Sequence, residues 1–241
     1  MSFELLSLFS CFLKLNFSKS FDEFLMSLSY KTRYDLKKKF KKTDGQSRID
    51  FEVVDDLGPD LREAYGLYRQ MMERQEARFE VLPEIFFKKA AENMPGKAKF
   101  FLWRMEGKLV AFAFGLVSGD YFLDAYLGLD YAVAYERHLY FVRFRDLFHW
   151  CLANGIRTYE MGCTNYDPKK RLDFTFVPLS IYAKFRNRWL NPFLGVVCEF
   201  IKPERHDPIL REIKKKEAQK NKKPRGTRPR VSLLSSRAGL S

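Results

Sequence analysis

The sequence predicts one α+β domain in which helices flank a central mixed, mainly antiparallel sheet. Three strand-like segments joined by short turns follow one another between residues 100 and 127, and a long helix pattern with two more strand-like segments comes after them. The chain has 241 residues, of which 46% are hydrophobic, so it can bury one substantial core. That core leaves little chain for a second full domain.

The first elements are two helices and a strand. Residues 21–28 have the pattern of a short helix, and Ser29 is a favourable N-cap for a second, very basic helix. Thr43-Asp44-Gly45 ends that helix. Residues 49–53 then alternate apolar and polar side chains, which predicts a half-buried strand.

Two further helices follow, one opened by Asp56 and Pro59 and one beginning near Pro83. Their apolar residues recur at helical spacing, which is typical of core positions rather than of a ligand-binding stripe. These core candidates are Leu61, Tyr65, Tyr68, Met72, Phe86, Phe87 and Ala90.

The next three segments predict an antiparallel meander. Residues 100–105, 109–117 and 121–127 are strand-like, and the turns Glu106-Gly107-Lys108 and Ser118-Gly119-Asp120 separate them. Strands joined by such short turns pair as neighbours in one sheet.

A crossover helix and two strands complete the pattern. The helix is predicted from Ala134 to Ala153, with a left-handed end at Asn154-Gly155. Residues 156–161 predict a strand, 162–173 a polar loop and 177–185 a further strand. Because the helix must cross over to reach the next strand, its N-terminus should point at the sheet edge, where free N–H groups suit a pyrophosphate.

The N-terminal residues 1–17 form an apolar lead-in. They include Glu4 and Lys14, they are too few to span a bilayer, and they lack the early basic region and cleavage site of a signal peptide. We expect a buried edge strand or a loosely packed lead-in, and a segment lying in a membrane interface is the alternative.

The formal net charge of +13 is concentrated in two segments. Residues 31–42 contain 7 basic residues and one acid, and residues 211–241 contain 11 basic residues and two acids. The rest of the chain is close to neutral, which does not favour a body that follows a nucleic-acid backbone. We expect the domain at residues 18–210 and a disordered basic tail at 211–241, because the tail has too few apolar residues to fold.

The four cysteines are scattered, and no C-x-x-C pair occurs. This spacing favours a reducing, cytoplasmic environment, with peripheral attachment to a membrane left open. His138 and His149 lie eleven residues apart, about 16 Å along a helix, which is too far for one metal ion. We therefore expect no metal site.

Several segments carry a family resemblance when they are taken in order. They are residues 21–39, Gly128-Leu129-Asp130, Ala153-Asn154-Gly155, Gly162 followed by Lys169, and Val177-Pro178-Leu179 with Tyr182. Together they resemble the CelD/BioF-like acetyltransferase domains, which have the GNAT fold and are relatives of the FemAB aminoacyl transferases. The similarity extends from about Phe17 to Leu210.

The resemblance implies a transferase that uses acetyl-CoA or another acyl-CoA as co-substrate, whereas FemAB relatives take aminoacyl-tRNA. It places the donor near residues 130–138, with Tyr126, Arg137 and His138 as cofactor-binding candidates. The general GNAT phosphate loop, R/Q-x-x-G-x-G/A, is absent there, because residues 131–137 contain no glycine. Family members also commonly have a second, degenerate GNAT-like lobe upstream, and only a short lead-in precedes residue 21 here.

Acyl transfer to an amine needs a base, an oxyanion donor and an acid. We expect the strand before residue 128 and the one after residue 155 to spread apart, and polar side chains gather around that point in the sequence. Our hypothesis makes Glu160 the base, Tyr166 the acid and Asp124 a third catalytic group, while Lys169 binds a phosphate or carboxylate of a substrate. The alternatives are a Glu160 paired with an arginine on a solvated face and a Lys169 that is simply solvated.

The basic helix at residues 31–42 allows three interpretations. It is an exposed amphipathic helix, a site for anionic lipid headgroups or a phosphorylated carrier substrate, or a contact for tRNA. Arg33 is its substrate-binding candidate. The basic tail allows the same kind of electrostatic attachment.

Two classes of function remain open. The favoured one is an N-acyltransferase that moves an acyl group from acyl-CoA to an amine of a cell-envelope or polysaccharide precursor, either small or carrier-linked; a FemAB-like aminoacyl-tRNA-dependent transferase is its variant. The other class is a non-catalytic GNAT-shaped binding module attached to anionic surfaces. The missing glycines favour the binding module, and the polar residues Glu160, Tyr166 and Lys169 favour the enzyme.

Overall fold

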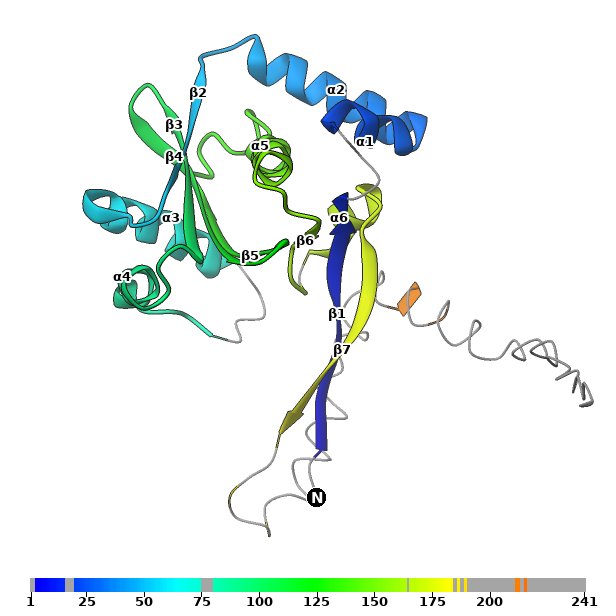
Figure 1. Cartoon of the computed structure of the whole chain (residues 1–241). Coiled ribbons are helices and arrows are strands. Elements are labelled where there is room, and N and C mark those ends of the chain that lie inside the picture. Colours follow the sequence, from blue (N-terminus) through cyan, green and yellow to red (C-terminus); the bar gives the residue numbers. More distant parts are fainter. Residues whose placement is uncertain are drawn as a thin grey trace, which may run out of the picture.

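The computed structural model describes residues 3–15, 20–74, 80–163 and 165–183, together with the single positions 186, 189, 211, 212 and 215. A seven-stranded sheet in the order β2-β3-β4-β5-β6-β1-β7 forms its centre, and helices cover both faces (Figure 1). All neighbouring strands are antiparallel except β5 and β6, which are parallel. The predicted α+β architecture with a mixed, mainly antiparallel sheet is confirmed.

The element bounds follow the predicted order closely. The strands are β1 (Phe3–Lys14), β2 (Ile49–Val54), β3 (Ala98–Met105), β4 (Lys108–Ser118), β5 (Tyr121–Leu129), β6 (Thr158–Glu160) and β7 (Thr175–Ala183). The helices are α1 (Phe21–Ser27), α2 (Tyr30–Asp44), α3 (Leu61–Arg74), α4 (Glu84–Asn93), α5 (Leu139–Ala153) and α6 (Tyr166–Arg171), with a short 3-10 turn, η2 (Gly58–Asp60), before α3. The meander, both early helices and the crossover helix are therefore present.

The local signals act as expected at several element ends. The Ser29 hydroxyl accepts a hydrogen bond from the Thr32 N–H at 3.3 Å and caps α2. Gly107 and Gly119 have φ values of 81° and 60°, which glycine adopts readily in the tight turns on either side of β4. Both features could be predicted from the sequence because they depend only on neighbouring residues.

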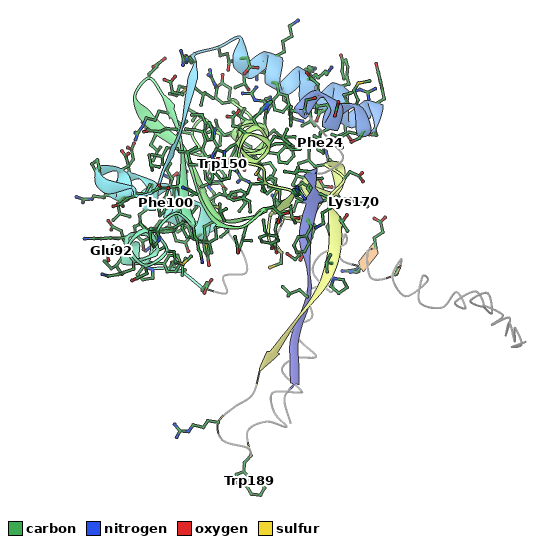
Figure 2. The ribbon with its side chains drawn as sticks, viewed as in Figure 1. Phe24, Glu92, Phe100, Trp150, Lys170 and Trp189 are labelled. Atoms are coloured by element: carbon green, nitrogen blue, oxygen red, sulfur yellow. The ribbon has the colours of Figure 1, made fainter. Side chains whose placement is uncertain are left out.

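The two faces of the sheet carry separate hydrophobic clusters. Helices α3 and α4 cover one face and bury Phe87, Phe100 and Phe112, while α1, α2 and α5 cover the other face. Figure 2 shows Phe100 on the first side and Phe24 and Trp150 on the second. Each sheet face therefore has its own helical cover, so a residue's position in the strand decides which layer its side chain enters.

Helix α5 begins at Leu139, five residues later than predicted. His138 has a φ of 50°, which interrupts a right-handed helix. The Asp130 carbonyl accepts the N–H groups of Val133 and Ala134 at 3.1 and 2.8 Å. The chain before α5 therefore forms turns.

The loop predicted at residues 162–173 contains the helix α6, so that prediction is wrong in part. Arg171 pairs with Asp167 one turn earlier, and Leu172 is fully buried at the end of the helix. A helix of six residues is too short to show a hydrophobic period in the sequence. The strand predicted at 156–161 is reduced to the three residues of β6.

The N-terminal lead-in is a strand, as expected, but it does not lie at the edge. β1 pairs with β6 through Phe12–Lys14 and with β7 through Phe3–Phe12. The outer parts of β1 and β7 extend away from the other strands as a two-stranded ribbon (Figure 1). The edge strand on this side of the sheet is β7, which accommodates Pro178 because an edge position needs no N–H on its open side.

Some predicted features lie outside the described residues. They are residues 1, 2, 16 and 17 of the lead-in, the end of the domain at residue 210, and all of the basic tail except positions 211, 212 and 215. Within the described part of the chain, no helix is long and apolar enough to cross a membrane.

Candidate active site

Strands β5 and β6 separate after three paired positions. Tyr121, Phe122 and Leu123 pair with Thr158, Tyr159 and Glu160, respectively. The pairing begins at the Asp120 carbonyl, which accepts the N–H groups of residues 157 and 158 at 2.7 and 3.0 Å. From Asp124 onwards, β5 does not pair with β6. The expected divergence of these two strands is confirmed.

A β-bulge in β5 lies at the point of divergence. Phe114 of β4 pairs with Tyr126, and the next residue, Gly115, pairs with Asp124, so Ala125 is an extra residue in β5. Such a bulge re-aims side chains and is over-represented next to active sites. Asp124 consequently faces α5, whereas Tyr126 packs in the cluster under α3 and α4.

Four side chains meet beneath α5 and form what we call the buried polar cluster: Asp124, Tyr140, Arg143 and Tyr159. Asp124 Oδ2 accepts hydrogen bonds from Arg143 Nη1 at 2.5 Å and from the Tyr159 hydroxyl at 2.9 Å. The Arg143 and Asp124 side chains are 1% and 3% exposed. The Arg143 guanidinium also lies over the Tyr140 ring, with its Cζ 5.5 Å from the ring centroid.

The cluster holds charged groups that are buried from solvent. Burial raises the pKa of Tyr140 and of Tyr159 above the usual tyrosine value, so both hydroxyls stay protonated at neutral pH. Three polar atoms of the cluster have no hydrogen-bond partner within the described chain, namely the Tyr140 hydroxyl and Arg143 Nε and Nη2.

Lys169 is buried next to the cluster. Its side chain donates to the carbonyls of Met161 and Gly162 at 2.6 and 3.2 Å, and the residue is 3% exposed. Burial lowers the pKa of its ammonium group, while the nearby Asp124 carboxylate opposes that shift. The interpretation of Lys169 as a solvated residue is therefore wrong. Tyr166 is also buried, with its ring centroid 5.9 Å from that of Phe176.

Glu160 lies on the face of the sheet opposite Asp124. It follows Tyr159, which points at α5, and successive side chains of a strand point to opposite faces. The Ser10 hydroxyl donates a hydrogen bond to Glu160 Oε1. No arginine among the residues that the structure describes forms an ion pair with Glu160, so the predicted arginine pairing is not observed.

The other predicted site residues form hydrogen bonds elsewhere. The Tyr126 hydroxyl donates to Glu80 at 2.6 Å. Arg137 donates to the Ser47 carbonyl, and Arg33 donates to the Met26 carbonyl at 3.1 Å. His138 precedes α5 in a left-handed conformation. In the described ranges, no three His, Cys, Asp or Glu side chains gather as metal ligands would.

The turn between β5 and α5 satisfies most of its own N–H groups. The Asp130 carboxylate accepts the N–H of Ala132 at 3.0 Å, and backbone carbonyls between residues 130 and 138 accept those of residues 133, 134, 137–139, 141 and 142. These are the N–H groups that the crossover geometry suggested for a pyrophosphate. A phosphate at this place would have to compete with existing hydrogen bonds.

Arg143 is not among the site residues predicted from the sequence. The signal that could have found it is its place in α5, three residues after Tyr140 and four before Leu147, which puts a charge in the middle of the apolar stripe. A charge at such a position is almost never buried without a partner. That partner, Asp124, lies nineteen residues away in another element.

Comparison with known families decides which fold family this arrangement belongs to. A family model described as an acetyltransferase (GNAT) domain matches residues 30–170, which is more than half of the chain. The chain belongs to the GNAT acetyltransferase family. This GNAT protein therefore contains an acyltransferase domain, in agreement with the resemblance. No curated protein sequence matches it significantly.

Solved structures with the same fold include FemX, with a TM-score of 0.54 and 13% identity over 70% of this chain and 59% of FemX. The C-terminal domain of a putative lysylphosphatidylglycerol synthetase from Agrobacterium fabrum has a TM-score of 0.54 and 13% identity over 82% of this chain and 66% of that one. The L-PGS structure from Bacillus licheniformis has a TM-score of 0.51 and 14% identity over 83% of this chain and 67% of that one. The GNAT chain thus spans about three fifths to two thirds of the length of these structures, and the likeness concerns the fold.

Proposed function

We propose that this GNAT protein is an N-acyltransferase that moves an acyl group from acyl-CoA to an amine of a cell-envelope or polysaccharide precursor. The observation that carries the proposal is the divergence of β5 and β6 after Leu123, directly above the buried polar cluster. Backbone groups of β5 beyond this residue have no partner in β6. Fixed backbone dipoles of this kind are suited to hold an acyl carbonyl and the oxyanion that forms from it.

The proton transfers are assigned to side chains around the divergence. Glu160 takes the proton from the attacking ammonium group, so that the amine lone pair can add to the acyl carbon. Tyr166 gives a proton to the departing thiolate of coenzyme A or alkoxide of tRNA. Asp124 acts through Arg143, because its carboxylate is committed to that guanidinium. Lys169 adds a positive charge to the site.

A second donor, aminoacyl-tRNA, is favoured by the turn before α5. Residues 131–137 contain no glycine, and most N–H groups of this turn donate hydrogen bonds within the chain. The resemblance to FemAB transferases implies the same donor. The product named in lysylphosphatidylglycerol synthetase contains a lysyl group, which is an aminoacyl group. Arg137 and His138 are the residues at this turn that would meet a phosphate of either donor, whereas Tyr126 faces α3 and α4.

The test is a transfer assay with both donors, combined with thermal unfolding. A ligand present at 100 times its Kd adds about 2.7 kcal/mol of stability. If acetyl-CoA or a longer acyl-CoA raises the melting temperature and labels an amine acceptor, the proposal is supported. If only charged tRNA does so, the second donor is correct. If neither donor shifts the melting curve nor labels an acceptor, the chain is a binding module and the enzyme proposal fails.

We further propose that the protein works in the cytoplasm at an anionic membrane surface, where α2 meets lipid headgroups or a phosphorylated carrier. Leu36 and Phe40 are buried on one side of α2, and its exposed side presents lysines 31, 37, 38, 41 and 42. Tyr30 and Tyr34 are 73% and 61% exposed on the same helix. Lysines next to exposed tyrosines suit the interface of an anionic bilayer.

Vesicle flotation tests this attachment. Anionic vesicles should retain the protein more than neutral ones, and the triple variant Lys37→Glu, Lys38→Glu, Lys41→Glu should lose that retention while keeping its melting temperature. Binding of tRNA with no preference for anionic vesicles would instead support the tRNA interpretation of α2.

A further inference from the structure

The unpartnered atoms of Arg143 form one complete edge of its guanidinium group. Nη1 binds Asp124, while Nε and Nη2 have no hydrogen-bond partner in the described chain. The N–H bonds of Nε and Nη2 point in parallel along the same edge. This pair of donors has the geometry that binds two oxygens of one carboxylate or phosphate group.

Tyr140 adds a third buried donor close to the guanidinium group. Its ring lies under the Arg143 guanidinium, and its hydroxyl is buried without a partner in the described chain. Burying a hydroxyl or a guanidinium edge without hydrogen bonds lowers the stability of a protein. Three such atoms in one place, all donors or able to donate, indicate a site prepared for an acceptor group.

The charges near this edge favour an anion. Arg143 and Lys169 are buried cations, and the charge of the Asp124 carboxylate acts on both of them. A ligand with one negative charge would be attracted to both cations. A carboxylate carries one charge and two coplanar oxygens, whereas a phosphate brings up to two charges and more oxygens than the free edge can bind.

From these observations we infer that Arg143 and Tyr140 form a subsite for a carboxylate group of a substrate of the acyl transfer. The role of this substrate rests on the proposed function. The substrate is either an amine acceptor or an acyl group that carries a carboxylate. The carboxylate oxygens accept from Nε and Nη2 of Arg143 and from the Tyr140 hydroxyl. Asp124 holds the guanidinium in place from its other edge.

Tyr140→Phe and Tyr159→Phe form a matched pair of variants that tests the subsite. The Tyr159 hydroxyl donates to Asp124, whereas the Tyr140 hydroxyl has no partner in the described protein. Tyr140→Phe should leave the melting temperature unchanged or raise it and weaken carboxylate binding roughly tenfold, because a hydrogen bond to a charged group is lost. Tyr159→Phe should lower the melting temperature and leave carboxylate binding within about twofold of wild type.

Binding is measured on the full chain without any acyl donor, by thermal shift and calorimetry with acetate, succinate and inorganic phosphate against potassium chloride of equal ionic strength. Arg143→Lys keeps the positive charge near Asp124 and removes the two-donor edge, so it should abolish the difference between carboxylate and chloride. Should Arg143→Lys fail to fold, the tyrosine pair still decides the question.

Three outcomes overturn the inference. The first is that carboxylates have no effect beyond that of chloride, and the second is that the protein prefers phosphate. The third is that the Tyr140→Phe variant binds carboxylate as tightly as wild type does, which would mean that the donors bind only buried water. Because no donor is present, the result is independent of the transferase assay. If the protein is inactive but binds carboxylate through Tyr140, the subsite is supported and only the proposed function is contradicted.

Discussion

Asp124 and Tyr126 lie two residues apart in β5 and project from opposite faces of the sheet. Asp124 joins Arg143 and Tyr159 beneath α5, and Tyr126 joins Glu80 and the aromatic cluster under α3 and α4. The extra residue Ala125 produces this reversal, since residues two apart in a regular strand share a face. The bulge therefore directs the Asp124 carboxylate into the layer that contains Arg143. The Asp124–Arg143 pair lies where β5 and β6 diverge.

Asp124→Asn should lower the free energy of unfolding by about 3–5 kcal/mol, because it leaves the Arg143 charge buried without its counter-charge. Urea unfolding followed by circular dichroism measures this change. Asp120→Asn is the control, since its carboxylate is 60% exposed and 3.9 Å from Arg157; its effect should stay below about 1 kcal/mol. Similar losses for the two variants would contradict a special role for the buried pair.

Gly128→Ala should destabilise the fold by roughly 1–3 kcal/mol or more. A Cβ at this position would lie 2.5 Å from the Tyr68 backbone nitrogen and 2.6 Å from the Leu67 carbonyl carbon, so α3 would have to move away from β5. Gly66→Ala is the matched control on α3, where a Cβ meets nothing within 4 Å. It should stabilise the protein by about 0.5–1 kcal/mol through helix propensity. Chemical denaturation of both variants checks the opposite signs.

Glu160→Gln should reduce turnover by roughly 10²-fold or more while donor affinity is retained, because it removes the proposed base and keeps the side chain's shape. Steady-state assays with separate donor-binding measurements check this split. Ser10→Ala removes the hydroxyl that donates to Glu160 and should have a smaller effect on turnover. Unchanged turnover in Glu160→Gln would assign the residue a structural role.

Stability should fall at alkaline pH through Cys11. The thiol is fully buried, and burial raises its pKa from 9.0 to about 12. Below pH 9 the contribution of Cys11 to the free energy of unfolding is fully present. As the pH rises towards the pKa of the folded state, the thiol ionises in the unfolded chain and not in the folded one. The free energy of unfolding therefore falls by about 1.4 kcal/mol per pH unit.

Urea unfolding of wild type and Cys11→Ala between about pH 8 and about pH 10 isolates this effect. The wild-type stability should decrease more steeply than that of the variant, whatever the difference in their absolute stabilities. Parallel curves would show that the Cys11 pKa is not raised in the folded protein.

Much of the architecture could be predicted because it depends on local patterns. The Ser29 cap, the glycine turns around β4 and the alternation in the meander each involve residues close in sequence, so local geometry settles them. The candidate residues Asp124, Glu160, Tyr166 and Lys169 were selected because they surround the predicted divergence. The start of α5 at Leu139 and the short helix α6 were not found, because a left-handed residue and a six-residue helix leave no periodic signal.

The sequence by itself determined the order of elements, the meander and the crossover helix, and with them the GNAT fold. Only the tertiary structure decided that β1 enters the sheet between β6 and β7, that Asp124 and Glu160 face opposite layers, and that Arg143 pairs with Asp124. The physical reason is that a single inserted residue in a strand changes which face a side chain takes, and partners nineteen residues or more apart are brought together only when the sheet closes.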